Sequence, residues 1–140
     1  MLVRSAVFDD IGLLDESYFL YFEETDFTLR AKRAGWSCWH VPQSRVVHLV
    51  GQSSGVTKHD RERQPLPAYW YESRSRFYFV NHGRVYAAIT DVLVALALVG
   101  WRVRRVIQGR DELDPPHFLR DVLRHSAAFR LAAPKARQID

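Results

Sequence analysis

Cysteine is almost absent from this 140-residue sequence, which contains only Cys38. A single cysteine excludes an internal disulfide, and a chain without disulfides suits a reducing compartment. Free cysteine is among the most buried residue types, so we expect Cys38 to lie in an apolar environment rather than to act as a reactive thiol. The opening residues, MLVRSAVFDD, also lack the basic region and long apolar run of a secretory signal. We therefore expect a cytoplasmic location.

Net charge is lacking in the first part of the chain. Residues 1–83 carry 10 basic and 10 acidic residues, whereas residues 84–140 carry 10 and 6, so the whole net charge of +4 lies in the second part. A basic segment of this kind can meet a nucleic acid or an anionic membrane surface. Its arginines alternate with Val, Leu and Ile more than with aromatic residues that could stack on bases, which disfavours a nucleic-acid partner.

The pattern divides the chain into a mixed α/β part, residues 1–67, and a helical tail, residues 68–140. The composition is 47% hydrophobic and 26% charged, which is globular and predicts a sizeable core. In the first part, short runs rich in apolar residues predict strands, and a small, polar, aperiodic run predicts a loop. The predicted strands cover residues 1–4, 36–41 and 45–50, and the loop covers 51–67.

Helix start and stop signals occur in both parts. A brief helix is expected from Ser5, as its N-cap, to Gly12, and a longer one over residues 23–34. The longer helix has acids in its first turn and bases near its end, and Phe27, Ala31 and Ala34 share one face. In the tail we expect helices over residues 68–83 and 84–109. The pair Asp114-Pro115 predicts a third helix that begins there.

The most apolar stretch runs from Val85 to Trp101, 17 residues interrupted by Asp91. A membrane span needs roughly 20 mostly apolar residues, so this stretch falls slightly short. On a helix, its apolar side chains lie on one stripe (Val85, Ile89, Val92, Leu96, Val99) and its charged ones on another (Arg84, Asp91, Arg102, Arg105). This layout favours a helix that lies in a membrane interface. Packing on a protein core and a true span are the other interpretations.

Three carboxylates, Glu23, Glu24 and Asp26, fall within the stretch YFEETDFTLR. Acids in the first turn of a helix are favourable by about 0.3–1 kcal/mol each, so a capping role explains one or two of them. The aromatic residues just upstream suggest a second interpretation, because an apolar wall beside a carboxyl group helps it to act as a general base. From this stretch alone, the capping role is favoured.

His48 lies near the end of the predicted strand RVVHLV and directly before the stretch GQSSG. A strand end can deliver a side chain to a small-residue loop that approaches phosphates closely. A lone histidine at a strand end is nevertheless more often structural than a ligand, and the sequence contains other histidines with no such context.

Taken together, residues 1 to about 55 resemble the C-terminal half of the catalytic domain of family 2 glycosyltransferases, particularly the bacterial rhamnosyltransferase-like branch. That family shows an Arg after a short strand, then G-x-x-D-E-x-F-F, an acidic pair, D-x-x-x-R-x-x-x-x-G, P-x-x-x-x-x-H and G-x-S. The matching residues are Arg4, Gly12, Asp15, Glu16, Tyr18, Phe19, Glu23, Glu24, Asp26, Arg30, Gly35, Pro42, His48, Gly51 and Ser53. This ordered set is much more specific than any of its members.

The resemblance implies an α/β fold, a partial GT-A-like domain that holds the acceptor side and is followed by an amphipathic helical tail. It implies transfer of a sugar from a nucleotide-sugar donor to a glycan or lipid-linked acceptor, with inversion at the anomeric carbon. The position of Glu24 is then the general base, although relatives commonly have Asp there, and Asp26 is the reserve candidate. Arg30 could pair with Asp26 at the i, i+4 spacing.

The resemblance also assigns the remaining site residues. Glu23, Arg30, Gly51 and Ser53 are expected to bind substrate, and His48 is expected to join a site for Mg²⁺ or Mn²⁺ and the donor diphosphate. The donor-binding half of the family and its Asp-x-Asp motif precede the matched region, and this sequence contains no Asp-x-Asp. We therefore expect the metal only together with a donor-binding half, supplied by a longer frame or a partner chain, without which the chain would be inactive. The alternative is a non-catalytic, membrane-associated module derived from a glycosyltransferase.

Overall fold

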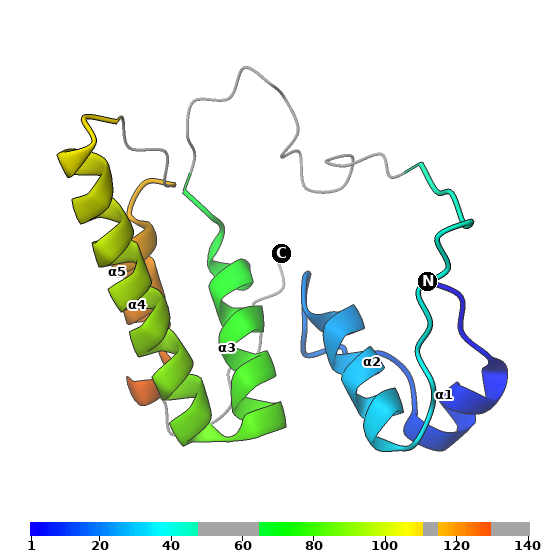
Figure 1. Ribbon diagram of the computed structural model, residues 1–140. Coiled ribbons are helices and arrows are strands. Elements are labelled where there is room, and N and C mark those ends of the chain that lie inside the picture. The colour runs from blue at the N-terminus through cyan, green and yellow to red at the C-terminus, as the bar shows by residue number, and fades with distance from the viewer. Residues whose placement is uncertain (48–64, 111–114, 130–140) are drawn as a thin grey trace.

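The computed structural model describes residues 1–47, 65–110 and 115–129. In chain order these form the helices α1 (Ser5–Ile11), α2 (Glu23–Arg33), α3 (Ala68–His82), α4 (Arg84–Ile107) and α5 (Phe118–Arg124), and a short 3-10 helix, η1 (Ala127–Phe129). Figure 1 shows α1 and α2 on one side, α4 and α5 on the other, and α3 between the two groups. The helix α3, the first of the tail, therefore lies between the helices of residues 1–47 and the rest of the tail.

The predicted strands are not formed in the described part of the chain. Residues 1–4, 36–41 and 45–47 contain no strand, although the chain turns at Pro42 and the amide of Ser44 donates to the carbonyl of Val41 at 3.0 Å. A two-stranded hairpin is marginal in water without a further strand or a helix to cover it, and the described residues supply no further strand. The α/β fold class as a whole stays a prediction.

The helix predictions are mostly confirmed. Acids begin α2 and bases end it, as the helix dipole favours, and Gly35 follows at a φ of 92°. The N-cap of α1 is Arg4 rather than Ser5, and no side chain caps it. The last helix begins at Phe118, later than predicted, because a residue followed by proline avoids the α conformation and Pro115 precedes Pro116.

The core of the first part is small. It consists of Val7, Phe27 and Ala31, and the rings of Phe8 and Phe27 lie 5.3 Å apart. The expectation that Cys38 lies in an apolar environment was wrong, because Cys38 is exposed; of the three residues predicted to share one face of α2, Phe27 and Ala31 are buried and Ala34, at the helix end, is exposed. Cys38 lies in the irregular segment after α2, so no second layer of described residues covers it.

An ion pair between buried side chains joins α3 to α4. Arg74 donates to Asp91, and the other oxygen of Asp91 accepts a hydrogen bond from the amide of Ala127 at 2.9 Å. Asp91 is 2% exposed, so a charged residue of the apolar helix faces inward. Gly83, whose φ is 84°, forms the sharp turn between the two helices.

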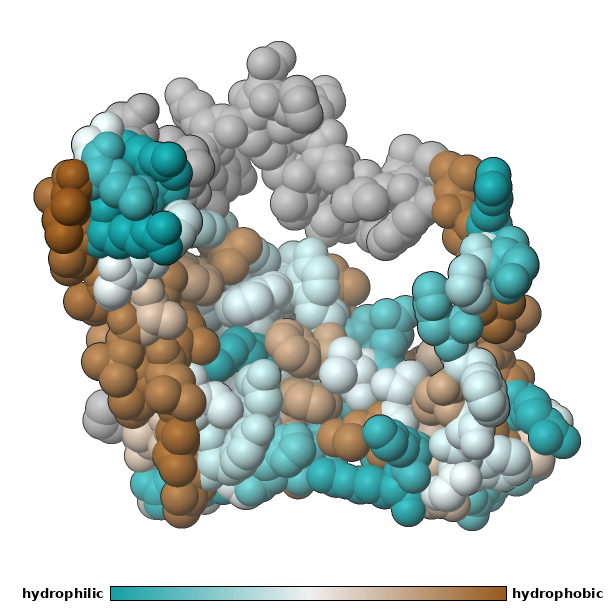
Figure 2. Space-filling view, in the orientation of Figure 1, coloured by the Kyte–Doolittle hydropathy of each residue, from teal (hydrophilic) through white to brown (hydrophobic). Residues whose placement is uncertain are grey.

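The division of α4 into two faces is confirmed, and its apolar face points outward. Nine large apolar side chains of α4 are 46% to 80% exposed, namely Val85, Ile89, Val92, Leu93, Leu96, Val99, Val103, Val106 and Ile107. Figure 2 shows hydrophobic side chains along the length of this helix at one edge of the molecule. The helix is 24 residues long and, by length and composition only, could cross a membrane.

The buried Asp91 provides a stability test. The variant Asp91→Ala should leave the guanidinium of Arg74 buried without its partner and the amide of Ala127 without an acceptor. We expect the free energy of unfolding to fall by about 3–5 kcal/mol, measured by urea denaturation. Asp9→Ala, at an exposed acid, should change it by less than about 0.5 kcal/mol. Equal effects of the two variants would show that the ion pair does not hold the helices together.

Candidate functional site

The candidate site lies at the N-terminal end of α2, where a strained turn precedes the acidic pair. Tyr21 and Phe22 have φ values of 70° and 68°. Residues other than glycine rarely adopt this left-handed conformation, which costs on the order of 1–3 kcal/mol each. The turn leads directly into α2 and places Glu23 and Glu24 in its first turn. Such strain persists only where surrounding contacts fix it, and it is concentrated at functional sites.

The two glutamates lie in different environments. Glu24 is exposed, and its carboxylate makes no hydrogen bond or ion pair with the described residues. Glu23 is half-buried, and its Oε2 atom is buried without a hydrogen-bond partner among the described residues. A buried acceptor that lacks a donor costs about 1–3 kcal/mol. The pair therefore combines one carboxylate that is open to solvent with one whose Oε2 is buried without a donor among the described residues.

Asp26, by contrast, is almost fully buried and accepts three hydrogen bonds. Its Oδ1 accepts from Nδ2 of Asn81 at 2.7 Å and from the hydroxyl of Tyr18 at 3.3 Å, and its Oδ2 accepts from Nε of Arg30 at 2.8 Å. The residue is 3% exposed. The carboxylate of Asp26 thus joins the aromatic segment, α2 and α3.

Arg30 is also bonded within the protein. Besides Asp26, its guanidinium donates to the carbonyls of Ile11 at 2.7 Å and Leu13 at 2.8 Å. The pairing with Asp26 predicted from the i, i+4 spacing is confirmed. These bonds tie α2 to the end of α1, whereas the role of Arg30 in substrate binding stays a prediction.

No residue of α3 was predicted from the sequence to belong to the site, yet α3 packs along it. The hydroxyl of Ser73 donates to the carbonyl of Leu20 at 3.0 Å, and the guanidinium of Arg76 bonds Asp15 at 2.6 Å. The ring of Phe22 lies 5.7 Å from that of Phe77. The polar residues Ser73, Arg76 and Asn81 of this helix rich in aromatic residues were the available signal, but nothing local indicated what they contact.

The surroundings of this helix contact shift the pKa values of two groups, Tyr18 and Asp15. Burial and the charge of Asp26 raise the pKa of the Tyr18 hydroxyl well above its usual value, so Tyr18 is a hydrogen-bond donor at neutral pH. For Asp15, burial raises the pKa, but hydrogen bonds from Arg76 and from the amide of Ser17 outweigh it, so the pKa is lowered overall. Asp15 is therefore ionised when it meets Arg76.

Three predicted site residues, His48, Gly51 and Ser53, lie outside the described residues. Within residues 1–47, 65–110 and 115–129, no three histidine, cysteine or acidic side chains gather where they could hold a metal ion. The described residues thus do not form a binding site for the divalent cation that the resemblance implies. The cation, and the role of His48 in binding it, stay predictions.

Two matched substitutions compare the buried carboxylate of Asp26 with the exposed carboxylate of Glu24. In Asp26→Asn, an amide N–H would replace one of the oxygens that accept from Asn81, Tyr18 and Arg30. We expect the free energy of unfolding to fall by about 1.5–3 kcal/mol in urea denaturation, the usual worth of a hydrogen bond to a charged group. Glu24→Gln, the same change at an exposed position, should alter it by less than about 0.5 kcal/mol. A stable Asp26→Asn variant would contradict the central role of this carboxylate.

Comparison with known proteins shows that the sequence is similar to parts of several glycosyltransferases. The chain is 40% identical over 55 residues to the N-acetylglucosaminyl-diphospho-decaprenol L-rhamnosyltransferase of Mycobacterium tuberculosis, a match that covers 39% of this chain and 18% of the relative. It is 28% identical over 117 residues to the low-salt glycan biosynthesis hexosyltransferase of Haloferax volcanii, covering 76% and 34%. It is 25% identical over 103 residues to a dTDP-rhamnosyl transferase of Shigella flexneri, covering 68% and 33%.

The matches span between 18% and 34% of the length of these relatives. No known family profile matches the chain, and no solved structure is significantly similar to it. The similar proteins are sugar transferases, two for rhamnose and one for a hexose. The sequence of this chain is thus related to glycosyltransferases.

Proposed function

We propose that this chain supplies the acceptor side of a glycosyltransferase and that Glu24 is its general base. One observation carries the choice of base: Asp26 is buried with three hydrogen-bond donors, whereas Glu24, two residues earlier, is exposed and makes no hydrogen bond with the described residues. A general base must be able to reach the proton that it removes. A carboxylate already bonded to three donors is poorly placed for that task, and the exposed one is well placed.

The proposed reaction is an inverting transfer from a nucleotide-sugar donor. The Glu24 carboxylate takes the proton of an acceptor hydroxyl as that oxygen bonds to the anomeric carbon, and the bond from this carbon to the donor diphosphate breaks. The diphosphate leaves with the electron pair. The relatives named for rhamnosyl and hexosyl transfer support a rhamnose or hexose donor and a glycan or lipid-linked acceptor. The donor side, with Mg²⁺ or Mn²⁺, belongs to a GT-A-like half outside the described residues.

The substitution Glu24→Gln tests the base. In an enzyme assembled from this chain and a donor-binding half, with dTDP-rhamnose among the donors, Glu24→Gln should lower kcat by about 10²–10⁴-fold, the usual contribution of general base catalysis. The amide cannot remove a proton, which explains the loss of kcat. It has the same size as the carboxylate and preserves the fold, so binding of the donor should be unchanged. Asp9→Asn, the same kind of change at an exposed acid outside the site, is the control and should leave kcat unchanged. Turnover that survives Glu24→Gln would assign the base to another residue.

The apolar face of α4 supports a membrane partner for the same chain. Trp101 is 44% exposed near the C-terminal end of α4, and Arg104 and Arg110 are exposed in the same region. Each cation near an anionic lipid surface contributes about 1 kcal/mol, and the apolar side chains would insert between headgroups. We propose that α4 lies in the inner face of the cell membrane, which would bring the site to a lipid-linked acceptor. The alternative, a non-catalytic membrane-associated module, would use the same surface but show no transfer.

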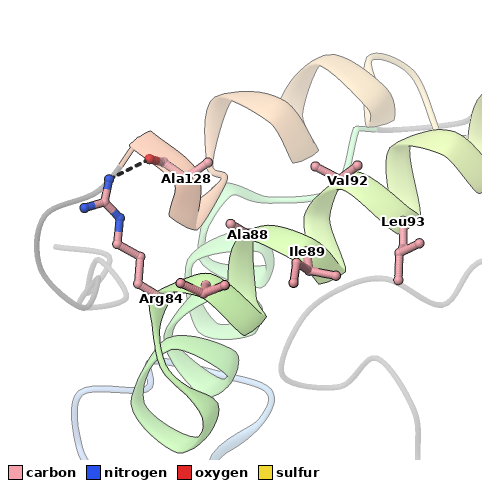
Figure 3. Close-up of a pocket in the computed structure, with 7 residues that line it drawn as sticks. Arg84, Ala88, Ile89, Val92, Leu93 and Ala128 are labelled. Carbon is pink, nitrogen blue, oxygen red and sulfur yellow. Dashed lines mark hydrogen bonds between the residues drawn. The ribbon is translucent and has the colours of Figure 1, made fainter.

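The apolar face is uninterrupted near the start of α4, where a groove of about 520 Å³ lies beside Ala128. In Figure 3, Arg84 reaches away from the side chains of Ile89 and Leu93 and donates to the carbonyl of Ala128 at 2.9 Å. This bond fixes η1 against the first turn of α4. The groove is lined mainly by apolar side chains of one helix, so it suits acyl chains better than a polar sugar.

Vesicle binding tests the membrane proposal. The chain should sediment with vesicles that contain phosphatidylglycerol and less with vesicles of phosphatidylcholine alone. Leu96→Glu places a charge in the apolar face and should abolish binding, since it removes about 1.5–3 kcal/mol of apolar burial and adds a desolvated carboxylate. Leu13→Glu, at an exposed leucine outside α4, is the matched control. Failure to bind vesicles would reject the membrane proposal. Conversion of a dimer to a monomer by Leu96→Glu would instead assign the apolar face to a second copy of the chain.

A further inference from the structure

A cluster of partly exposed aromatic rings lies beside the acidic pair. Phe19 and Tyr21 are 37% and 38% exposed, and Tyr69, in the first turn of α3, lies between them. The ring of Tyr69 is 5.2 Å from that of Phe19, edge to face, and 6.2 Å from that of Tyr21, nearly parallel. We call these three rings the aromatic platform. It is built from two segments that α3 holds together through Ser73 and Leu20.

The platform differs from the packed aromatic residues next to it. Phe22 turns toward α3 and packs 6.3 Å from Trp70 and 5.7 Å from Phe77. Tyr21 precedes it, and the two successive positive φ values direct adjacent rings to different surroundings. The ring of Tyr21 is thus partly exposed beside Tyr69 and is held there on a strained backbone. Backbone strain is concentrated at functional sites, so a strained turn beside a partly exposed ring points to a binding role.

The acidic pair limits what can lie on the platform. Glu23 follows Tyr21 by two residues, so their Cα atoms lie within about 7 Å. Oε2 of Glu23 is buried without a donor among the described residues, so a ligand hydroxyl would meet this half-buried carboxylate at its other oxygen, and the exposed carboxylate of Glu24 repels an anion. The occupant must therefore present C–H groups to aromatic faces and hydroxyl donors to a carboxylate, and it must carry no negative charge there. A pyranose ring has these properties.

We infer that Phe19, Tyr21 and Tyr69 bind the neutral sugar ring of the acceptor and that Glu23 accepts a hydrogen bond from one of its hydroxyls. The inference rests on the proposed glycosyl transfer and names the part of the acceptor that contacts the site. The ring stacks on the platform, and the hydroxyl that reacts lies toward Glu24. The diphosphate of a lipid-linked acceptor extends away from the two glutamates. Tyr69 is thereby a binding residue contributed by the helical tail.

Saturation-transfer NMR on the 140-residue chain tests the platform. The probes are the methyl glycosides of rhamnose, N-acetylglucosamine, galactose and mannose. Saturation of aromatic protein protons should reach the ring C–H protons of at least one of them. Tyr69→Ala should weaken that glycoside's binding about three- to tenfold, the range for one lost ring contact. Tyr69→Phe should restore it, because the ring rather than the hydroxyl makes the contact.

Trp39→Ala is the matched control, since Trp39 is an aromatic residue that is 82% exposed and lies outside the platform. It should leave binding unchanged, and circular dichroism should show that each variant is folded. Phe19→Ala provides a second platform variant should Tyr69→Ala unfold. The inference is overturned when no glycoside receives saturation, when both platform variants bind like the original chain, or when Trp39→Ala weakens binding equally.

The same variants separate this inference from the proposed function. Glu24→Gln should bind the glycoside normally while transfer is lost in the assembled enzyme. Loss of transfer in Glu24→Gln together with normal binding in Tyr69→Ala would reject the platform and keep the general base. Platform-dependent binding with full transfer in Glu24→Gln would keep the platform as a sugar site and reject the proposed base.

Discussion

The buried carboxylate of Asp26 is the contact on which the arrangement of the site depends. Its donors come from three places: Tyr18 before α2, Arg30 within α2, and Asn81 in α3, which is 55 residues away in sequence. Because a buried charge is costly unless each lone pair is satisfied, the three donors must arrive together. The consequence is a fixed position for α3 along the segment that contains the glutamates. Asp26 thus supports the site through structure, while the neighbouring Glu24 is exposed and makes no hydrogen bond with the described residues.

A second buried carboxylate, Asp91, determines how the rest of the tail is oriented. Its bonds with Arg74 and with the amide of Ala127 hold the polar side of α4 against α3 and η1. The described helices leave most of the apolar side uncovered, and it faces outward (Figure 2). A helix with the opposite orientation would bury more apolar area but would expose this ion pair. Since Arg74 and Asn81 lie on the same helix, the outward face of α4 and the acidic pair are held by one rigid element.

Local sequence signals predicted local structure well and distant contacts poorly. The acids and bases of α2 and the two faces of α4 were readable because helix dipoles and periodicity act within a few residues. The pairing of Arg30 with Asp26 followed from the same short range. Asn81 was missed because its partner lies far away in sequence, and Cys38 was misassigned because burial depends on neighbours that composition does not locate. The strands over 36–41 and 45–47 were wrong for a related reason, since a strand needs a partner that its own residues cannot supply.

The strained turn at Tyr21 and Phe22 shows how these levels combine. Neither residue favours a positive φ, so the conformation must be stabilised by contacts made elsewhere, and Phe22 makes them with Trp70 and Phe77 of α3. Packing of α3 therefore offsets the strain, and the strain directs Tyr21 toward Tyr69 while α2 begins at Glu23. If α3 were displaced, the strained turn would relax, the first turn of α2 would move, and the rings would separate from the carboxylates. The helical tail is for this reason part of the candidate site, as well as the segment that carries the apolar surface.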